Sequence, residues 1–414
     1  MENRDNSRRT LLKGGSAWFG LTVLRMAGPE RILGQQDAEV IPWLDEPPPN
    51  PVPQITGNLL RWETLDSRLT PADKFFYVQH YGIPDGLNDS TWHVDLHGLV
   101  ARPRSLTIAD LKARDHHEVE YTLECSGNNG IDGGFFIGGI GNARWGGTRL
   151  APLLESAGIL DQGTEVVFWG ADGGREIIRD NTGVVSGGRT GVVEPDTGGS
   201  QDLTVTETFA RSMSMREAMG RDNLLCYEMN GQSLPREHGF PVRLIAPGWY
   251  GVANVKWLTR IEVIDHRFAG KFMARDYVTV REEQRNGQTV WTFTTVGRAR
   301  LKSAPAKVTR QQNRYMVHGA AWGAPIASVQ VQVDDGPWME ATLDDPPETR
   351  RSRGYTWRLW RLNWDQPSSA VHTIRSRAID IDGNVQPTRD DATFASRRTF
   401  WEANAQIART VRIP

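Results

Sequence analysis

Residues 227–258 read YEMNGQSLPREHGFPVRLIAPGWYGVANVKWL, a segment in which turn residues and possible ligand groups alternate. Its Gly and Pro residues fix backbone turns, and between these turns stand His238, Arg243 and Lys256. Cationic and donor groups that converge on one point suit a bound phosphate or a polar heterocycle. Taken alone, the pattern is equally typical of a solvated loop with incidental charges.

A second segment, TLECSGNNG at residues 122–130, contains one of two cysteines in the chain. Cys125 follows the strand-like VEYTLE and enters a Gly/Asn turn, so we expect it at a strand end facing a cleft. A lone cysteine is most often a small buried hydrophobe. A thiolate is also a plausible metal ligand if an organic cofactor supplies the other soft donors.

Several common enzyme classes are excluded by missing motifs. Two cysteines, Cys125 and Cys226, cannot build a disulfide framework or a four-cysteine zinc site, and no C-x-x-C-H haem attachment motif occurs. GGFFIGGIGNARWGG (residues 133–147) resembles the start of a dinucleotide fingerprint, but Arg144 stands where the third glycine should be. G-x-S-x-G and H-E-x-x-H are also missing.

Length and charge limit the possibilities further. The 414 residues are enough for two or three domains. Lys and Arg number 48 against 50 Asp and Glu, so the formal net charge is −2 and a general nucleic-acid binder is disfavoured. The mean hydropathy of −0.48 excludes a polytopic membrane protein.

The N-terminus has the pattern of an export signal. The basic segment SRRTLLK (residues 7–13) precedes a short apolar run at residues 18–24, and paired arginines are typical of twin-arginine export. The alternative is a disordered basic tail. Because this route carries folded proteins, the pattern predicts a periplasmic enzyme that receives its cofactor in the cytoplasm.

Composition and periodicity divide the chain into five parts. These are a signal peptide (1–36), a Pro-rich extended lead-in (37–58), a mixed domain (59–270), an immunoglobulin-like sandwich of short alternating strands (271–400) and a C-terminal tail (401–414). The mixed domain contains helix patterns at residues 106–114 and 149–160, the second closed by Gly158. The Gly/Thr-rich segment 181–202 is either a lid or rim, or a floppy insertion.

The chain resembles the sulfite oxidase family of molybdenum enzymes, in particular its exported bacterial members without haem. The resemblance rests on TLECSGNNG, on IGNARWGGTRL (residues 140–150) and on residues 227–258. It extends from Asp66 to Phe268 and more loosely through the C-terminal part. It implies an α+β fold: a mixed α/β molybdopterin-binding domain followed by an immunoglobulin-like domain that mediates dimerisation.

The resemblance also implies the site. Cys125 would be the thiolate ligand of molybdenum, and one molybdopterin per chain would supply further sulfurs. Tyr277 matches the active-site tyrosine of the family; the alternative is a core tyrosine of the first β strand. Contacts to the pterin and its phosphate are implied for Tyr77, His80, Tyr81, Asp172, His238, Arg243, Asn254, Val255 and Lys256.

Three positions depart from the pattern of family members that oxidise sulfite. Val78 and Gly130 occupy positions where those members carry arginine, and Phe135 occupies a tryptophan position. Sulfite is a small dianion, and its desolvation without cationic partners is costly. Either Arg175 and Arg189 compensate, or the substrate differs from sulfite.

The function that the resemblance implies is two-electron oxygen-atom transfer, with sulfite or a related sulfur compound as reductant. No haem is expected in this chain, so electrons would pass to a separate carrier such as a c-type cytochrome, and the enzyme would be a homodimer without a nucleic-acid partner. Two alternatives stay open: a reductase of an S- or N-oxide with the same cofactor, and a non-catalytic exported β-sandwich binding module.

Overall fold

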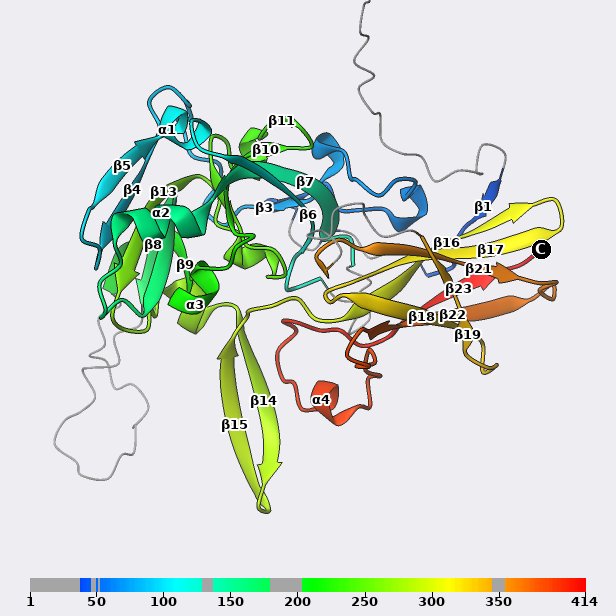
Figure 1. Cartoon of the computed structure of the whole chain (residues 1–414). Helices are drawn as coiled ribbons and strands as arrows, with labels where there is room; N and C mark the ends of the chain where they lie inside the picture. The colour runs from blue at the N-terminus through cyan, green and yellow to red at the C-terminus, as the bar shows by residue number, and fades with distance from the viewer. Residues whose placement is uncertain (1–37, 46–49, 51–52, 129–136, 179–202, 345–353) are drawn as a thin grey trace, which may run out of the picture.

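The computed structural model describes residues 38–45, 50, 53–128, 137–178, 203–344 and 354–414. They form two strand-rich bodies side by side, with a long hairpin projecting below their junction (Figure 1). The segments predicted as signal (1–36) and as lid or insertion (181–202) lie outside the described residues. No helix in the described part has the length and apolar character needed to cross a lipid bilayer.

The first sheet of the N-terminal body has the strand order β5-β4-β13-β8-β9. Its strands are β4 (His93–Gly98), β5 (Arg104–Thr107), β8 (Glu165–Ile178), β9 (Leu203–Ser214) and β13 (Leu258–Ile264). Only β13 beside β4 is parallel among these pairs. Helix α2 (Leu150–Ala157) buries its leucines in the core of this body and ends at Gly158, whose φ of 71° is left-handed, as the sequence predicts.

The second sheet has the order β11-β10-β7-β6, with β12 also paired to β10. Its strands are β6 (His116–Glu124), β7 (Ile140–Arg149), β10 (Leu224–Met229), β11 (Gln232–Ser233) and β12 (Arg243–Ile245). Cys125 comes directly after β6, as expected. Trp145 of β7 is fully buried beneath this sheet, which anchors the strand that pairs with β6 over its whole length.

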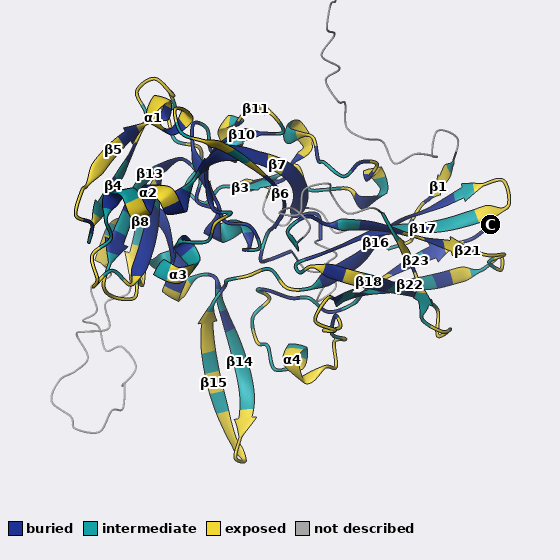
Figure 2. Cartoon of the chain, viewed as in Figure 1, coloured by how far each residue is buried: buried dark blue, intermediate teal, exposed yellow. Residues whose placement is uncertain are grey.

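The C-terminal body is a sandwich of two antiparallel sheets, with orders β1-β16-β17-β21-β20 and β19-β18-β22-β23. The strands are β1 (Glu39–Ile41), β16 (Lys302–Gln311), β17 (Arg314–Trp322), β18 (Ile326–Val333), β19 (Met339–Glu340), β20 (Thr342–Leu343), β21 (Arg358–Trp364), β22 (Val371–Asp380) and β23 (Ile407–Arg412). Apolar residues alternate along them and pack between the sheets. Buried residues follow the strands of both bodies (Figure 2). The α+β fold with a C-terminal sandwich is therefore confirmed.

Shorter elements complete the fold. They are β2 (Thr56–Gly57), β3 (Tyr77–Val78), α1 (Ile108–Lys112), α3 (Met215–Ala218), the hairpin of β14 (Val278–Arg285) and β15 (Gln288–Thr295), α4 (Ala392–Ala395), 3₁₀ turns at Trp62–Thr64, Ala72–Lys74, Arg236–His238 and Gly251–Ala253, and a π-helical turn at Lys271–Arg275. Helix α1 begins with a capping box between Thr107 and Asp110, where the sequence predicts a helix.

The expected C-terminal tail is wrong, because residues 407–412 form β23 inside the sandwich. Ile407, Val411 and Ile413 point into the protein. Arg409 interrupts this apolar period, because a charged residue stands at an inward-facing position. Its guanidinium is buried and pairs with the carboxylate of Asp45 at 2.6 Å. A charged residue at an inward position hides the strand pattern, and only the distant carboxylate makes its burial possible.

Two expected boundaries also differ. The Pro-rich lead-in contributes Ile41 and Trp43 to the sandwich core, so it is more than an extended connector. At the other boundary, Phe272, Tyr277 and Val296 belong to the core of the N-terminal body, and the hairpin of β14 and β15 pairs with neither sandwich sheet. The sandwich therefore starts at β16 rather than at residue 271.

Candidate active site

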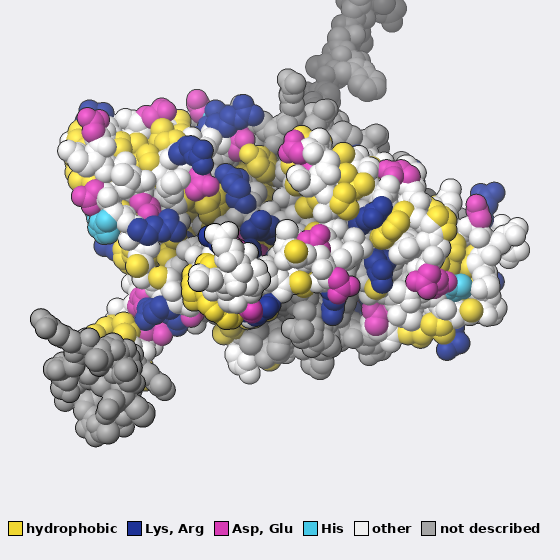
Figure 3. Space-filling model, turned by 90° about the horizontal axis from the view of Figure 1, so that it is seen from below, with side chains coloured by type: hydrophobic (Ala, Val, Ile, Leu, Met, Phe, Trp, Pro, Cys, Tyr) yellow, Lys and Arg dark blue, Asp and Glu magenta, His cyan; other side chains and the backbone are white. Residues whose placement is uncertain are grey.

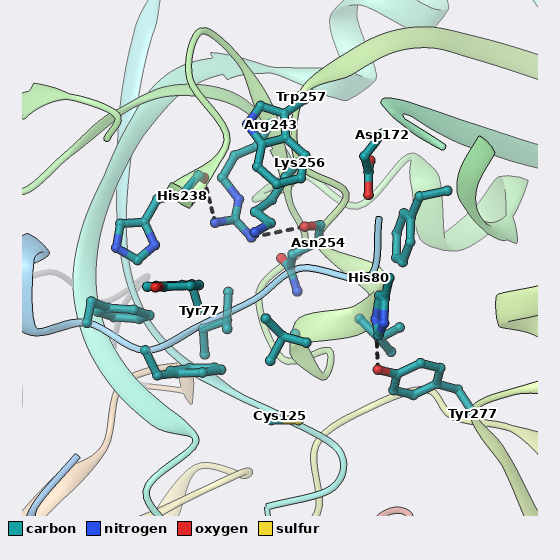
Figure 4. A pocket seen from close by; sticks show the side chains of 17 residues that line it. Tyr77, His80, Cys125, Asp172, His238, Arg243, Asn254, Lys256, Trp257 and Tyr277 are labelled. Atoms are coloured by element: carbon teal, nitrogen blue, oxygen red, sulfur yellow. Dashed lines mark hydrogen bonds between the residues drawn. The ribbon is translucent and has the colours of Figure 1, made fainter. Parts of the chain in front are cut away.

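One pocket of about 640 Å³, including its open mouth, lies where β6 ends beside the turns that follow β10 and β12 (Figure 4). Its wall is formed by Phe75, Phe76, Tyr77, Val78, His80, Leu123, Cys125, Asp172, Phe209, His238, Arg243, Gly251, Val252, Asn254, Lys256, Trp257 and Tyr277. This size and mixture of apolar and polar groups are typical of a cofactor or small-molecule site.

Cys125 forms the floor of the pocket as drawn in Figure 4. Its backbone N–H donates to the carbonyl of Gly139 at 2.8 Å, and its own carbonyl accepts from Asn128 at 2.9 Å. These bonds fix the turn that presents the thiol. Burial raises the pKa of Cys125 to about 11, so the thiol carries its proton until a metal displaces it, as metals do with coordinating thiols.

A cationic corner lies opposite Cys125. Arg243 donates to the carbonyl of His238 at 2.8 Å and to the carbonyl of Asn254 at 2.9 Å, and its face lies over Trp145. Lys256 donates to the carbonyl of Glu237 at 2.8 Å. Each cation is thus held by neutral carbonyls, which fix its direction without neutralising it.

Local backbone geometry brings these groups together. Gly239 has a φ of 106°, and a Cβ there would lie 3.0 Å from the Cβ of Arg243 and 3.1 Å from that of Lys256. A side chain at this position would therefore separate the two cations. Asn254 accepts from the backbone N–H of Ala246 at 2.7 Å, which ties the strand of Arg243 to the turn before Lys256.

The corner is short of negative charge. Burial lowers the pKa of Lys256 to about 7, and burial followed by the charge of Arg243 lowers that of His238 to about 3. Asp172 is the one carboxylate among the described lining residues, and burial raises its pKa to about 6. The Nε of Arg243 has no hydrogen-bond partner within the described part of the chain. A phosphate-bearing ligand would satisfy this donor set, so the residues present fit a molybdopterin.

Asp172 reaches the pocket because of an irregularity in the first sheet. The pairing of β8 with β9 shifts register between Trp169 and Gly173, and a bulge of this kind redirects a side chain. Asp172 is buried, and its Oδ1 lacks a hydrogen-bond partner among the described residues. It is therefore positioned to accept from a donor group of a bound ligand.

Tyr277 and His80 form the other side wall. The Tyr277 hydroxyl and the His80 Nε2 lie 2.9 Å apart, and burial lowers the pKa of His80 to about 4. The neutral imidazole is stacked on Phe209 and packed against Phe272. Tyr277 has a left-handed φ of 55° and stacks on Trp401 with ring centroids 4.3 Å apart. Such backbone strain persists where packing enforces it.

The wall between Cys125 and Tyr77 is apolar. Val78, at the position expected for arginine, lines the pocket together with Phe76 and Leu123. Arg175, a candidate to replace the missing charge, belongs to the part of β8 paired with Thr206 and is not among the described lining residues. Gly130, Phe135 and Arg189 lie outside the described residues.

The structure brings together most of the residues implied by the sequence. Those that line the pocket are Tyr77, His80, Cys125, Asp172, His238, Arg243, Asn254, Lys256 and Tyr277. Two do not line it. The hydroxyl of Tyr81 donates to Glu176 at 2.9 Å, and Val255 packs in the core while its carbonyl accepts from Leu244.

Sequence reasoning missed several aromatic lining residues, among them Phe75, Phe209 and Trp257. Phe209 lies on β9 with no motif around it, so the sequence carries no local signal for it. Trp257 could have been found from its place beside Lys256, whose ammonium lies 4.2 Å from the indole centroid.

Comparison with known proteins assigns both bodies. Residues 80–272 match an oxidoreductase molybdopterin binding domain, and residues 298–401 match a Mo-co oxidoreductase dimerisation domain. The chain is 30% identical to sulfite oxidase of Arabidopsis thaliana over 371 residues, which cover 81% of this chain and 88% of that protein. It is 31% identical to mitochondrial sulfite oxidase of Mus musculus over 345 residues, 77% of this chain and 57% of the mouse protein.

A solved structure shares the fold. The sulfane dehydrogenase SoxCD from Paracoccus pantotrophus aligns with a TM-score of 0.69 at 23% identity, covering 91% of this chain and 90% of that chain. The alignment therefore spans both bodies, including the sandwich. The molybdopterin-binding match includes the segment of Cys125, the cationic corner and His80.

Proposed function

The chain belongs to the sulfite oxidase family of molybdopterin-dependent oxidoreductases, and from this premise we propose that it oxidises a sulfur compound of low charge by two electrons and passes them to an external acceptor. The observation that carries the proposal is the convergence of Cys125, the cationic corner and the Tyr277–His80 pair on one pocket. The family relationship favours this enzyme over a non-catalytic binding module.

Molybdenum held by a pterin dithiolene and one thiolate supplies reversible two-electron transfer coupled to oxygen-atom transfer. Of the chain's own residues, Cys125 would provide the thiolate. Arg243, Lys256 and His238 would bind the phosphate and orient the pterin. The Tyr277 hydroxyl, held by His80, offers a neutral hydrogen-bond donor to substrate, and the phenyl and valyl wall excludes water.

The electrostatics of the pocket favour a substrate of low charge. Val78 occupies a position at which family members that oxidise sulfite are expected to carry arginine. It presents methyl groups to the pocket instead of a positive charge. The cations that do line the pocket are bound to carbonyls on the pterin side. An anion that enters the pocket loses its bound water, and without a paired cation nothing compensates for the free energy of that loss. A neutral or singly charged sulfur group therefore fits better than a dianion.

The test is a substrate screen with purified enzyme of known molybdenum and pterin content. With ferricyanide as oxidant, we expect an uncharged organic sulfane to be oxidised faster than the dianion sulfite. Faster turnover of sulfite would refute the low-charge substrate. Reduction of an S- or N-oxide by the reduced enzyme, without oxidation of any sulfur compound, would instead support the reductase.

A matched pair of cysteine variants assigns the metal ligand. Cys125→Ser should abolish turnover, whereas Cys226→Ser should retain it, because Cys226 is buried in β10 and outside the described pocket wall. Equal loss in both variants would contradict the role of Cys125.

We further propose that the protein is exported through the twin-arginine route to the periplasm, that it forms a homodimer, and that its acceptor is a c-type cytochrome. The paired arginines at residues 8–9 support export, and the dimerisation-domain match supports the dimer. Replacement of both arginines by lysine should retain the protein in the cytoplasm, and light scattering should give twice the chain mass.

A further inference from the structure

The segment Phe400–Glu402 of the C-terminal body touches the turn that carries the proposed metal ligand. The backbone N–H of Glu402 donates to the carbonyl of Ser126 at 2.8 Å, one residue after Cys125. A Cβ on Gly127 would lie 3.0 Å from the Phe400 ring and 3.3 Å from the Trp401 ring. Both rings therefore pack directly on the backbone that follows Cys125.

Three aromatic rings lead from the pocket to the surface. Tyr277 lines the pocket and stacks on Trp401 at a centroid distance of 4.3 Å, with an angle of 29° between the rings. Trp401 in turn contacts Phe400 at 4.0 Å. Phe400 is 51% exposed. The contact series begins at the active site, at Tyr277 just before β14, and ends in solvent in the segment that follows α4; α4 lies beside the β14–β15 hairpin (Figure 1).

Arginine side chains gather around this end, and those of Arg300 and Arg398 are exposed. Arg397 donates to the carbonyl of Trp401 at 3.1 Å, Arg398 pairs with Glu282, and two further arginines, Arg281 and Arg300, lie 3.7 Å from the nearly buried carboxylate of Glu402. Four arginines thus stand against two glutamates. In the view from below, Lys and Arg side chains lie near the middle of the face, with Asp and Glu side chains among them (Figure 3).

We infer that electrons leave the site through the turn after Cys125 and the rings of Trp401 and Phe400, to a one-electron carrier protein whose contact face is acidic. The inference rests on the function proposed above and names the side of the molecule where the acceptor binds. Charge complementarity favours an acidic partner, because opposite fields steer the encounter of two proteins.

The balance of electrons and protons follows from the proposed oxidation of substrate. One substrate molecule and one water give the oxygenated product, two protons and two electrons. Each electron reduces one oxidised carrier, so two carriers are consumed per turnover, and the protons go to solvent. Trp401 and Phe400 are neither oxidised nor reduced, since they provide close contact between the site and the bound carrier.

The test measures reoxidation alone, so that it does not depend on the identity of the substrate. Holoenzyme is reduced anaerobically with titanium(III) citrate, freed of excess reductant by gel filtration, and mixed in a stopped-flow instrument with oxidised plastocyanin, an acidic one-electron carrier. We expect Phe400→Ser to slow reoxidation about tenfold, the effect of losing an aromatic contact at the centre of an interface. The matched control is Phe293→Ser, because Phe293 is 69% exposed on the neighbouring hairpin, and it should react at the wild-type rate.

Trp401→Leu should be at least as slow as Phe400→Ser, with molybdenum content measured to show that cofactor is retained. Added salt should slow the wild-type reaction with plastocyanin, whereas mitochondrial cytochrome c, a basic carrier, should react slowly at low salt. Equal rates for wild type, Phe400→Ser and Trp401→Leu would overturn the route. Faster reaction with cytochrome c at low salt would overturn the acidic partner. A substrate screen that finds no sulfur oxidation would overturn the proposed function without changing these rates.

Discussion

Lys302→Met should be strongly destabilising, because it breaks an ion pair that is closed off from water between the two bodies. Lys302, on β16, places its Nζ 2.5 Å from Glu124 Oε1, and the two side chains are 1% and 0% exposed. The same Nζ donates to the carbonyl of Asn128 at 2.9 Å, and Asn128 donates to Glu124 at 3.0 Å. The pair thus anchors both ends of the turn that contains Cys125.

The magnitude follows from the separation and the burial. At 2.5 Å and an effective dielectric constant of about 20, the attraction is about 7 kcal/mol. Desolvation of the two ions costs several kcal/mol each, so the intact pair is roughly neutral for stability. Removal of Lys302 alone leaves the Glu124 carboxylate buried without its partner, which costs about 3–5 kcal/mol.

Urea denaturation followed by tryptophan fluorescence measures this cost. Lys302→Met should lower the free energy of unfolding by about 3–5 kcal/mol, and Lys302→Met combined with Glu124→Gln should recover most of the loss. The control is Lys307→Met on the same strand, where Nζ donates to the carbonyl of Leu65 at 2.6 Å and about 1 kcal/mol should be lost. If both lysine variants cost the same, or if the double variant is as unstable as the sum of its parts, the reasoning about the buried pair is wrong.

Three further outcomes are expected. Lys256→Met should leave the cofactor-free protein equally or more stable to urea, because burial already lowers the pKa of this ammonium to about 7, while molybdenum and pterin content fall; retention of full cofactor would contradict its role. His80 has a pKa of about 4 in the folded chain against 6.5 ordinarily. Its contribution to the free energy of unfolding is therefore present above pH 6.5 and is lost, by up to about 3 kcal/mol, as the pH falls to 4. His80→Gln should flatten that part of the pH–stability curve, and an unchanged slope would refute the assignment. Gly141→Ala would place a Cβ 2.6 Å from the Phe75 ring, so thermal unfolding should show a loss of about 1–3 kcal/mol from overpacking, whereas an unchanged melting temperature would mean that the pocket wall yields freely.

Much of the site could be predicted from the sequence because its signals are local. Cys125 follows a strand and enters a turn, and His238, Arg243 and Lys256 are spaced by turns within one segment of the chain. The resemblance then supplied the roles of these residues and added Tyr277 and the other implied contacts. The helix at Leu150–Ala157 and its closing glycine also depend on neighbours within a few residues.

Through three short motifs that resemble the family, the sequence by itself thus determined the family, the proposed metal ligand and the cationic corner, since each motif depends on residue type and short spacing. The tertiary structure decided which distant side chains complete them. Arg409 on β23 is tolerated inside the sandwich because Asp45, 364 residues away, meets its charge, and Trp401 reaches Tyr277 across the junction of the two bodies. A buried charge or ring is stable only with the partner that folding delivers, and no local pattern of residues specifies that partner.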